Sequence, residues 1–365
     1  MRSVELFTGC GGLGLGLARS GFRHDLMVEW NSDAVQTILH NRARGVEHIA
    51  HWPIVKSDVR EIDWRAHSGV DLVAGGPPCQ PFSIGGKHRG DDDHRDMWPQ
   101  AIRSVREIRP RAFLFENVRG LTRPKFAGYL QSIVDGLSHP SAELRYEVQV
   151  LSVNAADFGA AQKRHRVVLA GVRADQLVET APALRPTHSR ERLLWEQFVT
   201  GEYWKEYAID RSIDSYDPID AAAVRRLRAG GVAPTEKRWV TVRDKLKGLG
   251  EPNGKNNHVF QRGAKIYKGH TGSPLDQPAK ALKAGDHGVP GGENMMVLPN
   301  GDVRYFTTRE AARLQGLPDE YEFPRSWTES MRQLGNAVPC ELAEAIGAWM
   351  TRILTDDGKR LPIAA

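Results

Sequence analysis

The sequence predicts an α/β fold with a mostly parallel sheet, followed by a smaller second domain. Up to residue 172, short β-branched apolar runs alternate with helical segments, which is the pattern of strands buried between helices. Several of these runs end in glycine or an acidic residue, and ligand sites form at the carboxyl ends of parallel strands. Beyond residue 172 the alternation stops, and 365 residues are enough for two domains.

The first elements read as strand, glycine loop and helix. Residues 4–7 form a strand candidate, and residues 8–16 contain five glycines before a helical pattern that continues through Ala18. Glycines let the backbone approach a ligand, and a helix N-terminus offers free N–H groups. The next strand, residues 24–30, contains Glu29 near its end, where a carboxylate can take the two hydroxyls of a ribose. A surface carboxylate is the alternative.

Later segments show the same pattern of a strand with an acidic residue near its end. They are predicted at residues 54–55, 70–74, 111–118, 146–153 and 166–172, with an amphipathic helix at 100–108. Asp58 follows the third strand, and Glu116 lies near the carboxyl end of the fifth. Two acids therefore join Glu29 along one predicted edge of the sheet.

The loop at residues 75–83 is the strongest candidate for a reactive group. Its prolines fix φ and disfavour helix, so the chain leaves the strand as a stiff extended loop that carries Cys79. Most free cysteines are small buried hydrophobes, but this loop has no apolar periodicity that could pack. We therefore predict that Cys79 is a nucleophile.

The second half of the chain is less regular. Residues 180–306 contain turn signals without βα alternation, which predicts a smaller irregular domain. Residues 307–310 form a capping box that opens a helix at 310–314. Residues 335–339 lead into an apolar-faced helix at 341–354, which could pack back on the first domain.

Composition narrows the functional classes. No apolar run approaches the ~18 residues of a membrane span, and the N-terminus runs into a strand without a signal peptide. Cys10, Cys79 and Cys340 lack metal-ligand spacing, which predicts a reducing cytoplasm and no metal. The net charge is +5.

The basic charge is concentrated late in the chain. Residues 221–285 contain 14 Lys/Arg and 4 Asp/Glu, whereas residues 186–220 contain 4 and 8. A basic block interleaved with Trp239, Phe260 and Tyr267 suits phosphate contact and base stacking. A solvated face is the ordinary alternative.

Taken together, these motifs resemble those of the bacterial cytosine-C5 DNA methyltransferases. The resemblance spans residues 2–350, broken near 180–306, with one shortened run at 94–98. The motifs that carry it are Phe7-Thr-Gly-Cys-Gly-Gly12, Glu29-Trp30, Gly75-Gly-Pro-Pro-Cys-Gln-Pro-Phe-Ser83, Phe115-Glu-Asn-Val118, Gln162-Lys-Arg-His-Arg166, Arg309 through Gln315-Gly-Leu-Pro318, and Gly335-Asn-Ala-Val-Pro339.

The resemblance implies a fold and a reaction. The fold is a class I S-adenosylmethionine-dependent methyltransferase domain, Rossmann-like with seven strands, at residues 1–178 and completed by 328–365. A target-recognition domain would occupy 179–327. The reaction is methyl transfer from S-adenosylmethionine to C5 of a cytosine in a specific double-stranded DNA sequence, which leaves S-adenosylhomocysteine.

It also implies roles for the catalytic residues. Cytosine C5 is a poor nucleophile, and attack of the Cys79 thiolate on C6 would load electron density onto it. Charge then develops at N3 and O2, where Glu116 and the pair Arg164 and Arg166 are the candidates, Arg166 being the stronger of the two arginines. Read without the resemblance, Glu116 could instead form a structural ion pair.

Cofactor and DNA residues follow from the same resemblance. The glycine loop would meet the methionine part of the cofactor, Glu29 the ribose, and Phe7 and Trp30 the adenine. The full cofactor set is Phe7, Gly9, Cys10, Gly11, Gly12, Glu29, Trp30, Asp58, Val59, Pro78, Asn336 and Val338. Cys10 would contribute backbone, and Cys340 packing.

The target base must leave the duplex to react. Ser83, Arg262 and His287 are the predicted DNA contacts, and the glycine-rich segment 285–293 is a candidate for reading bases. The expected setting is the cytoplasm, at the nucleoid. A cognate restriction endonuclease would act on the same site without a stable complex.

Other interpretations stay open. A tRNA cytosine methyltransferase would act on RNA and usually has a shorter target segment. A nicotinamide-dependent oxidoreductase would use Gly9-x-Gly-x-x-Gly14, but leaves Cys79 and Glu116 without a role. An inactive DNA-binding relative is disfavoured because every catalytic position is filled.

Overall fold

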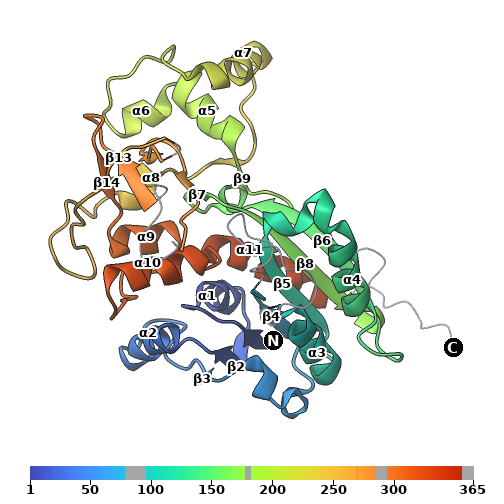
Figure 1. The fold of residues 1–365 in the computed structure, drawn as a ribbon. Coiled ribbons are helices and arrows are strands. Elements are labelled where there is room, and N and C mark those ends of the chain that lie inside the picture. The colour runs from blue at the N-terminus through green and yellow to red at the C-terminus, as the bar shows by residue number, and fades with distance from the viewer. Residues whose placement is uncertain (79–95, 177–181, 269, 285–293, 356–365) are drawn as a thin grey trace.

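A seven-stranded sheet forms the centre of the computed structural model, which describes residues 1–78, 96–176, 182–268, 270–284 and 294–355. Its strands are β1 (Arg2–Leu6), β2 (Arg23–Glu29), β3 (Ile54–Lys56), β4 (Leu72–Gly75), β5 (Ala112–Val118), β6 (Tyr146–Asn154) and β8 (His165–Arg173). They lie in the order β3-β2-β1-β4-β5-β8-β6, and β8 runs antiparallel to both of its neighbours (Figure 1). The predicted mostly parallel seven-stranded sheet is confirmed.

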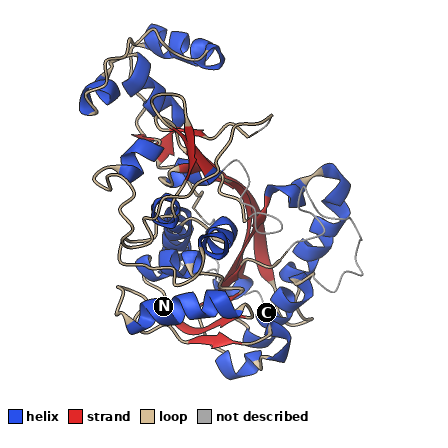
Figure 2. Cartoon of the chain, turned by 60° about the vertical axis from the view of Figure 1, so that its left-hand side comes forward, coloured by secondary structure: helices blue, strands red, loops and turns tan. Residues whose placement is uncertain are grey.

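Helices cover both faces of this sheet (Figure 2). The helices α1 (Gly12–Arg19), α2 (Ser32–Ala43) and α11 (Cys340–Thr355) pack on one face, and α3 (Trp98–Ile108) and α4 (Ala127–Ser138) pack on the other. Close approach of α1 to α11 depends on glycine: a Cβ on Gly16 would lie 2.3 Å from the Cβ of Ala343. The predicted C-terminal helix thus packs back on the first domain.

Residues 182–306 lie within the predicted target-recognition domain and are called the target segment below. They are more helical than the sequence predicts. The target segment contains α5 (Arg190–Phe198), α6 (Glu202–Glu206), α7 (Ala221–Gly230) and α8 (Val242–Leu246). Its short strands are β9 (His188–Ser189), β10 (Lys237–Arg238), β11 (Ser273–Pro274), β12 (Ala279–Lys280), β13 (Met295–Val297) and β14 (Val303–Tyr305). The helices α5, α6 and α7 surround their own apolar cluster, which includes Leu194, Phe198 and Trp204.

Several contacts join this segment to the sheet. Strand β12 pairs in parallel with β7 (Gln162–Lys163), directly before β8. One apolar cluster includes Met27 of the sheet, Leu282 of the target segment and Leu314 of α9 (Thr308–Leu314). The predicted boundaries at 178/179 and 327/328 stay a prediction.

The C-terminal part begins with the predicted capping box. Thr307 Oγ1 accepts a hydrogen bond from the Glu310 N–H at the start of α9, and the Glu310 carboxylate accepts one from the Thr307 N–H. The helix α10 (Trp327–Asn336) follows and ends at the turn before α11.

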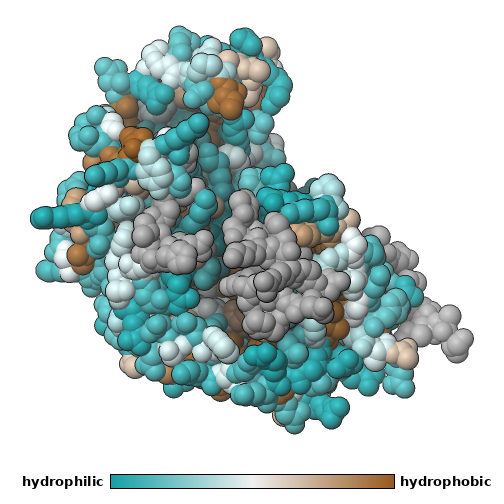
Figure 3. All heavy atoms as spheres, in the orientation of Figure 1, coloured by the Kyte–Doolittle hydropathy of each residue, from teal (hydrophilic) through white to brown (hydrophobic). Residues whose placement is uncertain are grey.

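One face of the molecule is mainly polar (Figure 3). On the face that Figure 3 shows, hydrophilic residues predominate, and apolar residues form small separate groups. Within the described ranges, no helix is both long and apolar enough to cross a bilayer.

Candidate active site and cofactor cleft

Glu116 of β5 and Arg166 of β8 meet near the carboxyl end of β5, on two neighbouring inner strands of the sheet. The antiparallel register sets Val118 opposite Arg166, and Arg166 Nε lies 2.5 Å from Glu116 Oε1. The two side chains are only 14% and 11% exposed. The contact is an ion pair without hydrogen-bond geometry, since neither of these two atoms has a hydrogen-bond partner. The pair is therefore a charged and nearly buried site.

The stem of the cysteine loop passes beside this pair. Asn117 Nδ2 donates a hydrogen bond to the Pro77 carbonyl over 3.0 Å. A Cβ on Gly76 would lie 3.5 Å from Glu116 Oε2, so the loop runs along the carboxylate. Asn117 lies in the motif Phe115-Glu-Asn-Val118, and its side chain anchors the stem of the loop, a role that the sequence did not reveal. Cys79 itself, like Ser83, lies outside the described residues.

Arg164, the other predicted arginine, lies in a different environment from Arg166. Its side chain is buried, with 2% of the residue exposed. It donates hydrogen bonds to the backbone carbonyls of Leu282 (2.8 Å) and Gly335 (2.6 Å). Burial without a carboxylate hydrogen-bonded to it lowers the pKa of its guanidinium. The structure thus brings Glu116 and Arg166 together and places Arg164 in the packed interior.

The glycine loop is held by Glu29. Its Oε2 accepts a hydrogen bond from the Gly9 N–H and its Oε1 accepts one from the Asn31 N–H, both over 2.7 Å. Gly9 and Gly11 have φ values of +59° and +85°, which side chains beyond glycine rarely adopt. The carboxylate is therefore fixed at the end of β2, beside the loop.

The C-terminal turn completes this region. A Cβ on Gly12 would lie 2.3 Å from the Val338 carbonyl oxygen, so the loop after β1 and the turn before α11 are in direct contact. Residues far apart in the sequence, predicted together as cofactor ligands, are thus neighbours.

The other predicted cofactor residues differ in exposure. Trp30 is 68% exposed at the end of β2, whereas Val59 and Val338 are buried. The exposed or half-buried members of the set are Phe7, Asp58, Pro78 and Asn336. The Asp58 carboxylate accepts hydrogen bonds from the Arg60 side chain, which lowers the pKa of Asp58.

The two described cysteines are structural. Burial raises the pKa of the Cys10 thiol to about 12, and its Sγ lies 3.6 Å from the Gln333 carbonyl. The Tyr321 hydroxyl donates to the Cys10 carbonyl over 2.7 Å. Cys340 is fully buried at the start of α11. Neither thiol has the low pKa and exposure of a nucleophile.

The predicted DNA residues are only partly described. Arg262 is exposed, and so are Phe260 and Tyr267, each 53%. Trp239 is not available for base stacking, since it is buried and its Nε1 donates to Asp157 Oδ1 over 2.9 Å. His287 and the rest of 285–293 lie outside the described residues. In the part of the chain that the structure describes, no cluster of ligating side chains could hold a metal ion.

The sequence matches one protein family over nearly its whole length, and several type II methyltransferases are similar to it. The model of the family described as "C-5 cytosine-specific DNA methylase" matches residues 1–352. The type II methyltransferase M.NgoMIV of Neisseria gonorrhoeae is 32% identical over 361 residues, which cover 96% of this chain and 97% of the relative. M.NaeI of Lentzea aerocolonigenes is 30% identical, covering 98% and 76%.

Solved structures share the fold. A DNA modification methyltransferase from an Escherichia coli prophage has a TM-score of 0.60 at 23% identity, with 97% of this chain and 99% of that chain covered. Spodoptera frugiperda DNMT2 gives 0.63 at 15% identity, covering 96% and 99%. With a family model that extends over nearly the whole sequence, this chain belongs to the C-5 cytosine-specific DNA methylases, enzymes that methylate cytosine in DNA.

Proposed function

We propose that this enzyme methylates one cytosine within a specific sequence of double-stranded DNA, after that base leaves the helix, with Cys79 as nucleophile. The observation that carries the proposal is the Glu116–Arg166 pair beside residues 76–78, the stem of the loop that bears Cys79. A carboxyl group beside a guanidinium suits a polar ring edge.

The chain's own groups account for the electron flow. The Cys79 thiolate forms a bond to C6, and the electrons of the C5–C6 double bond move toward C5. We assign to Glu116 the transfer of a proton to N3 and its return when the thiolate leaves, while Arg166 N–H groups donate to O2. Once C5 carries the methyl group, a base removes the C5 proton, the double bond re-forms and the thiolate leaves.

S-adenosylmethionine is the methyl donor on which this family depends; when bound, it supplies the methyl group as an electrophilic carbon on sulfur. We assign its binding to the glycine loop and the C-terminal turn. Glu29 is fixed where it can accept from ribose hydroxyls, and Trp30 offers an exposed ring beside it. A Cβ on Gly9 would meet no atom within 4 Å, so the loop leaves open space there.

We assign the reading of DNA to residues 179–327. Arg262, Phe260 and Tyr267 are exposed in a stretch that has no acidic residue between Glu251 and Asp276. Because the relatives are type II methyltransferases, we also propose a restriction endonuclease that cleaves the same sequence without a stable complex.

Bisulfite sequencing tests the reaction and reveals the site. DNA from cells that express the enzyme should show one cytosine, in one sequence context, fully protected, and cells with Cys79→Ala should show none. Duplex DNA with 5-fluorocytosine at that position should form a covalent adduct, because fluorine cannot leave as a proton does. Modification of RNA alone, or turnover of Cys79→Ala within tenfold of wild type, would contradict the proposal.

A further inference from the structure

Arg164 lies where three distant segments of the chain meet. It precedes β8, its Nη1 donates to the Leu282 carbonyl, and its Nη2 donates to the Gly335 carbonyl. Leu282 belongs to the target segment, and Gly335 directly precedes the cofactor turn. One guanidinium thus bridges two carbonyls that belong to different functional parts.

The target-segment side of this junction is tightly built. A Cβ on Gly335 would lie 2.2 Å from the Ala284 backbone nitrogen, so residues 282–284 rest on the backbone of α10. Asn294 is fully buried, and its side chain accepts from the Lys283 N–H (3.0 Å) and donates to the Lys283 carbonyl (2.9 Å). A shift of residues 282–284 would therefore press on Gly335.

The cofactor side is equally close. Asn336 and Val338 lie one and three residues after Gly335. The Val338 carbonyl lies against Gly12 of the glycine loop. Because packed interiors are stiff, displacement of Gly335 moves the wall of the proposed cofactor cleft. Bidentate donation by a planar guanidinium fixes both carbonyls at once, which a lysine ammonium cannot do equally well.

We propose that Arg164 is a positioning residue that couples binding of target DNA to binding of the cofactor, by fastening residues 282–284 to Gly335. The inference rests on the proposed function, because it takes DNA and S-adenosylmethionine as the two ligands. It gives Arg164 a role distinct from that of Arg166, without contact to the reacting base.

The test measures coupling rather than affinity. Calorimetry gives the Kd of S-adenosylhomocysteine for the full chain, alone and saturated with a duplex that carries the sequence found by bisulfite sequencing. For the wild type we expect the duplex to tighten the Kd by about tenfold, a common size for coupled sites. For Arg164→Met we expect a factor below about two, and for Arg164→Lys an intermediate factor of about three.

Arg309 provides a matched control. It is 1% exposed, and within the described ranges its hydrogen bonds go to backbone carbonyls, those of Asn256, Pro318 and Tyr321. Its guanidinium also lies 4.0 Å from the Asp319 carboxylate. Arg309→Met should lose comparable stability but keep the wild-type coupling factor. A merely structural role for Arg164 would make both variants behave alike.

Several outcomes would overturn the inference. They are a wild-type factor near one, an unchanged factor in Arg164→Met, or an equal loss in Arg309→Met. If circular dichroism shows that Arg164→Met does not fold, Arg164→Lys decides, and a wild-type factor there overturns the inference. Absence of any methylated cytosine would instead contradict the proposed function, and the coupling would then be measured with plasmid DNA.

Discussion

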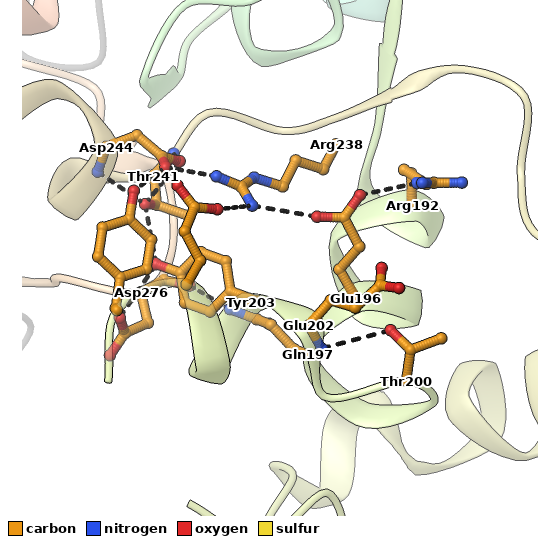
Figure 4. Close-up of polar contacts among 12 residues, drawn as sticks. Arg192, Glu196, Gln197, Thr200, Glu202, Tyr203, Arg238, Thr241, Asp244 and Asp276 are labelled. Atoms are coloured by element: carbon orange, nitrogen blue, oxygen red, sulfur yellow. Dashed lines mark hydrogen bonds and ion pairs between the residues drawn. The ribbon is translucent and has the colours of Figure 1, made fainter. Parts of the chain in front are cut away.

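Two arginine–carboxylate sites in this molecule are built differently. At the sheet edge, Arg166 faces one carboxylate, that of Glu116, and the closest atoms of the pair make no hydrogen bond. In the target segment, Arg238 of β10 is enclosed by acids (Figure 4). Its Nη1 donates to Glu196 and Glu206, over 3.0 and 2.8 Å, and its Nη2 donates to Asp244 over 2.7 Å.

The two sites differ in how many acidic partners the arginine has, three for Arg238 and one for Arg166 among the described residues. Arg238 also lies 5.0 Å from the ring of Tyr203, so its charge is satisfied on several sides. It ties α5, α6 and α8 together beside their apolar cluster. In the Glu116–Arg166 pair, by contrast, one guanidinium faces one carboxylate among the residues that the structure describes. We infer that chemistry depends on the first pair and folding on the second.

The largest expected effect is on catalysis. Glu116→Gln keeps the shape but cannot donate the same proton, so we expect methyl transfer to fall about 10²–10⁴-fold. The Kd of S-adenosylhomocysteine should stay within about threefold, because Glu116 does not hold the glycine loop. Tritiated methyl transfer and calorimetry measure the two. Glu206→Gln is the control, and an equal loss of rate there would erase the contrast between the sites.

The next effect is a pH dependence from a buried, satisfied histidine. His24 shares a hydrogen bond with Ser3 Oγ (2.9 Å) and another with the Gly14 carbonyl (3.0 Å), and burial lowers the pKa of His24 to about 4. Between about pH 6.5 and pH 4 the unfolded chain binds a proton that the folded chain does not. Stability should therefore fall as the pH drops through this window, by up to about 3 kcal/mol.

Thermal unfolding between pH 7 and pH 4.5 measures this effect. His24→Gln keeps a donor and an acceptor without a titrating ring, so its melting temperature should fall less steeply with acid than that of the wild type. An unchanged slope would show that other groups carry the dependence.

The smallest effect concerns folding of the target segment. Arg238→Met leaves three carboxylates without their shared partner, and we expect a loss of about 1–3 kcal/mol in the free energy of unfolding. Arg226→Met removes an exposed pair with Glu191 and should change it by less than about 0.5 kcal/mol. Urea unfolding compares them. Equal stability of the two variants would refute the structural role of Arg238.

Much of the sheet could be predicted because a strand that is buried on both faces needs apolar residues at successive positions, which appear in the sequence as continuous apolar runs. Residues 70–74 and 111–118 were located in this way, and β4 and β5 occupy nearly those positions. The edge at which Glu116 lies followed from strand direction alone. The ends of strands are set locally, by glycine, proline and charge.

Partners from distant segments could not be predicted. Arg164 and Arg166 share one face of the strand by spacing, so spacing alone does not distinguish their environments. Only the arrival of Leu282 and Gly335 at Arg164 does so. The helices α5 and α7 were not predicted for a related reason. Their apolar cluster forms between short segments, and the apolar periodicity of such segments is weak.

The contact between Gly12 and Val338 has a consequence for synthesis. The glycine loop is among the first parts of the chain to leave the ribosome, yet its opposite wall is made more than 300 residues later. A nascent chain can pair β1 with β2 early but lacks this wall until residue 338 has emerged. Methyl donor binding should therefore begin only near the end of translation, when the DNA-reading part already exists.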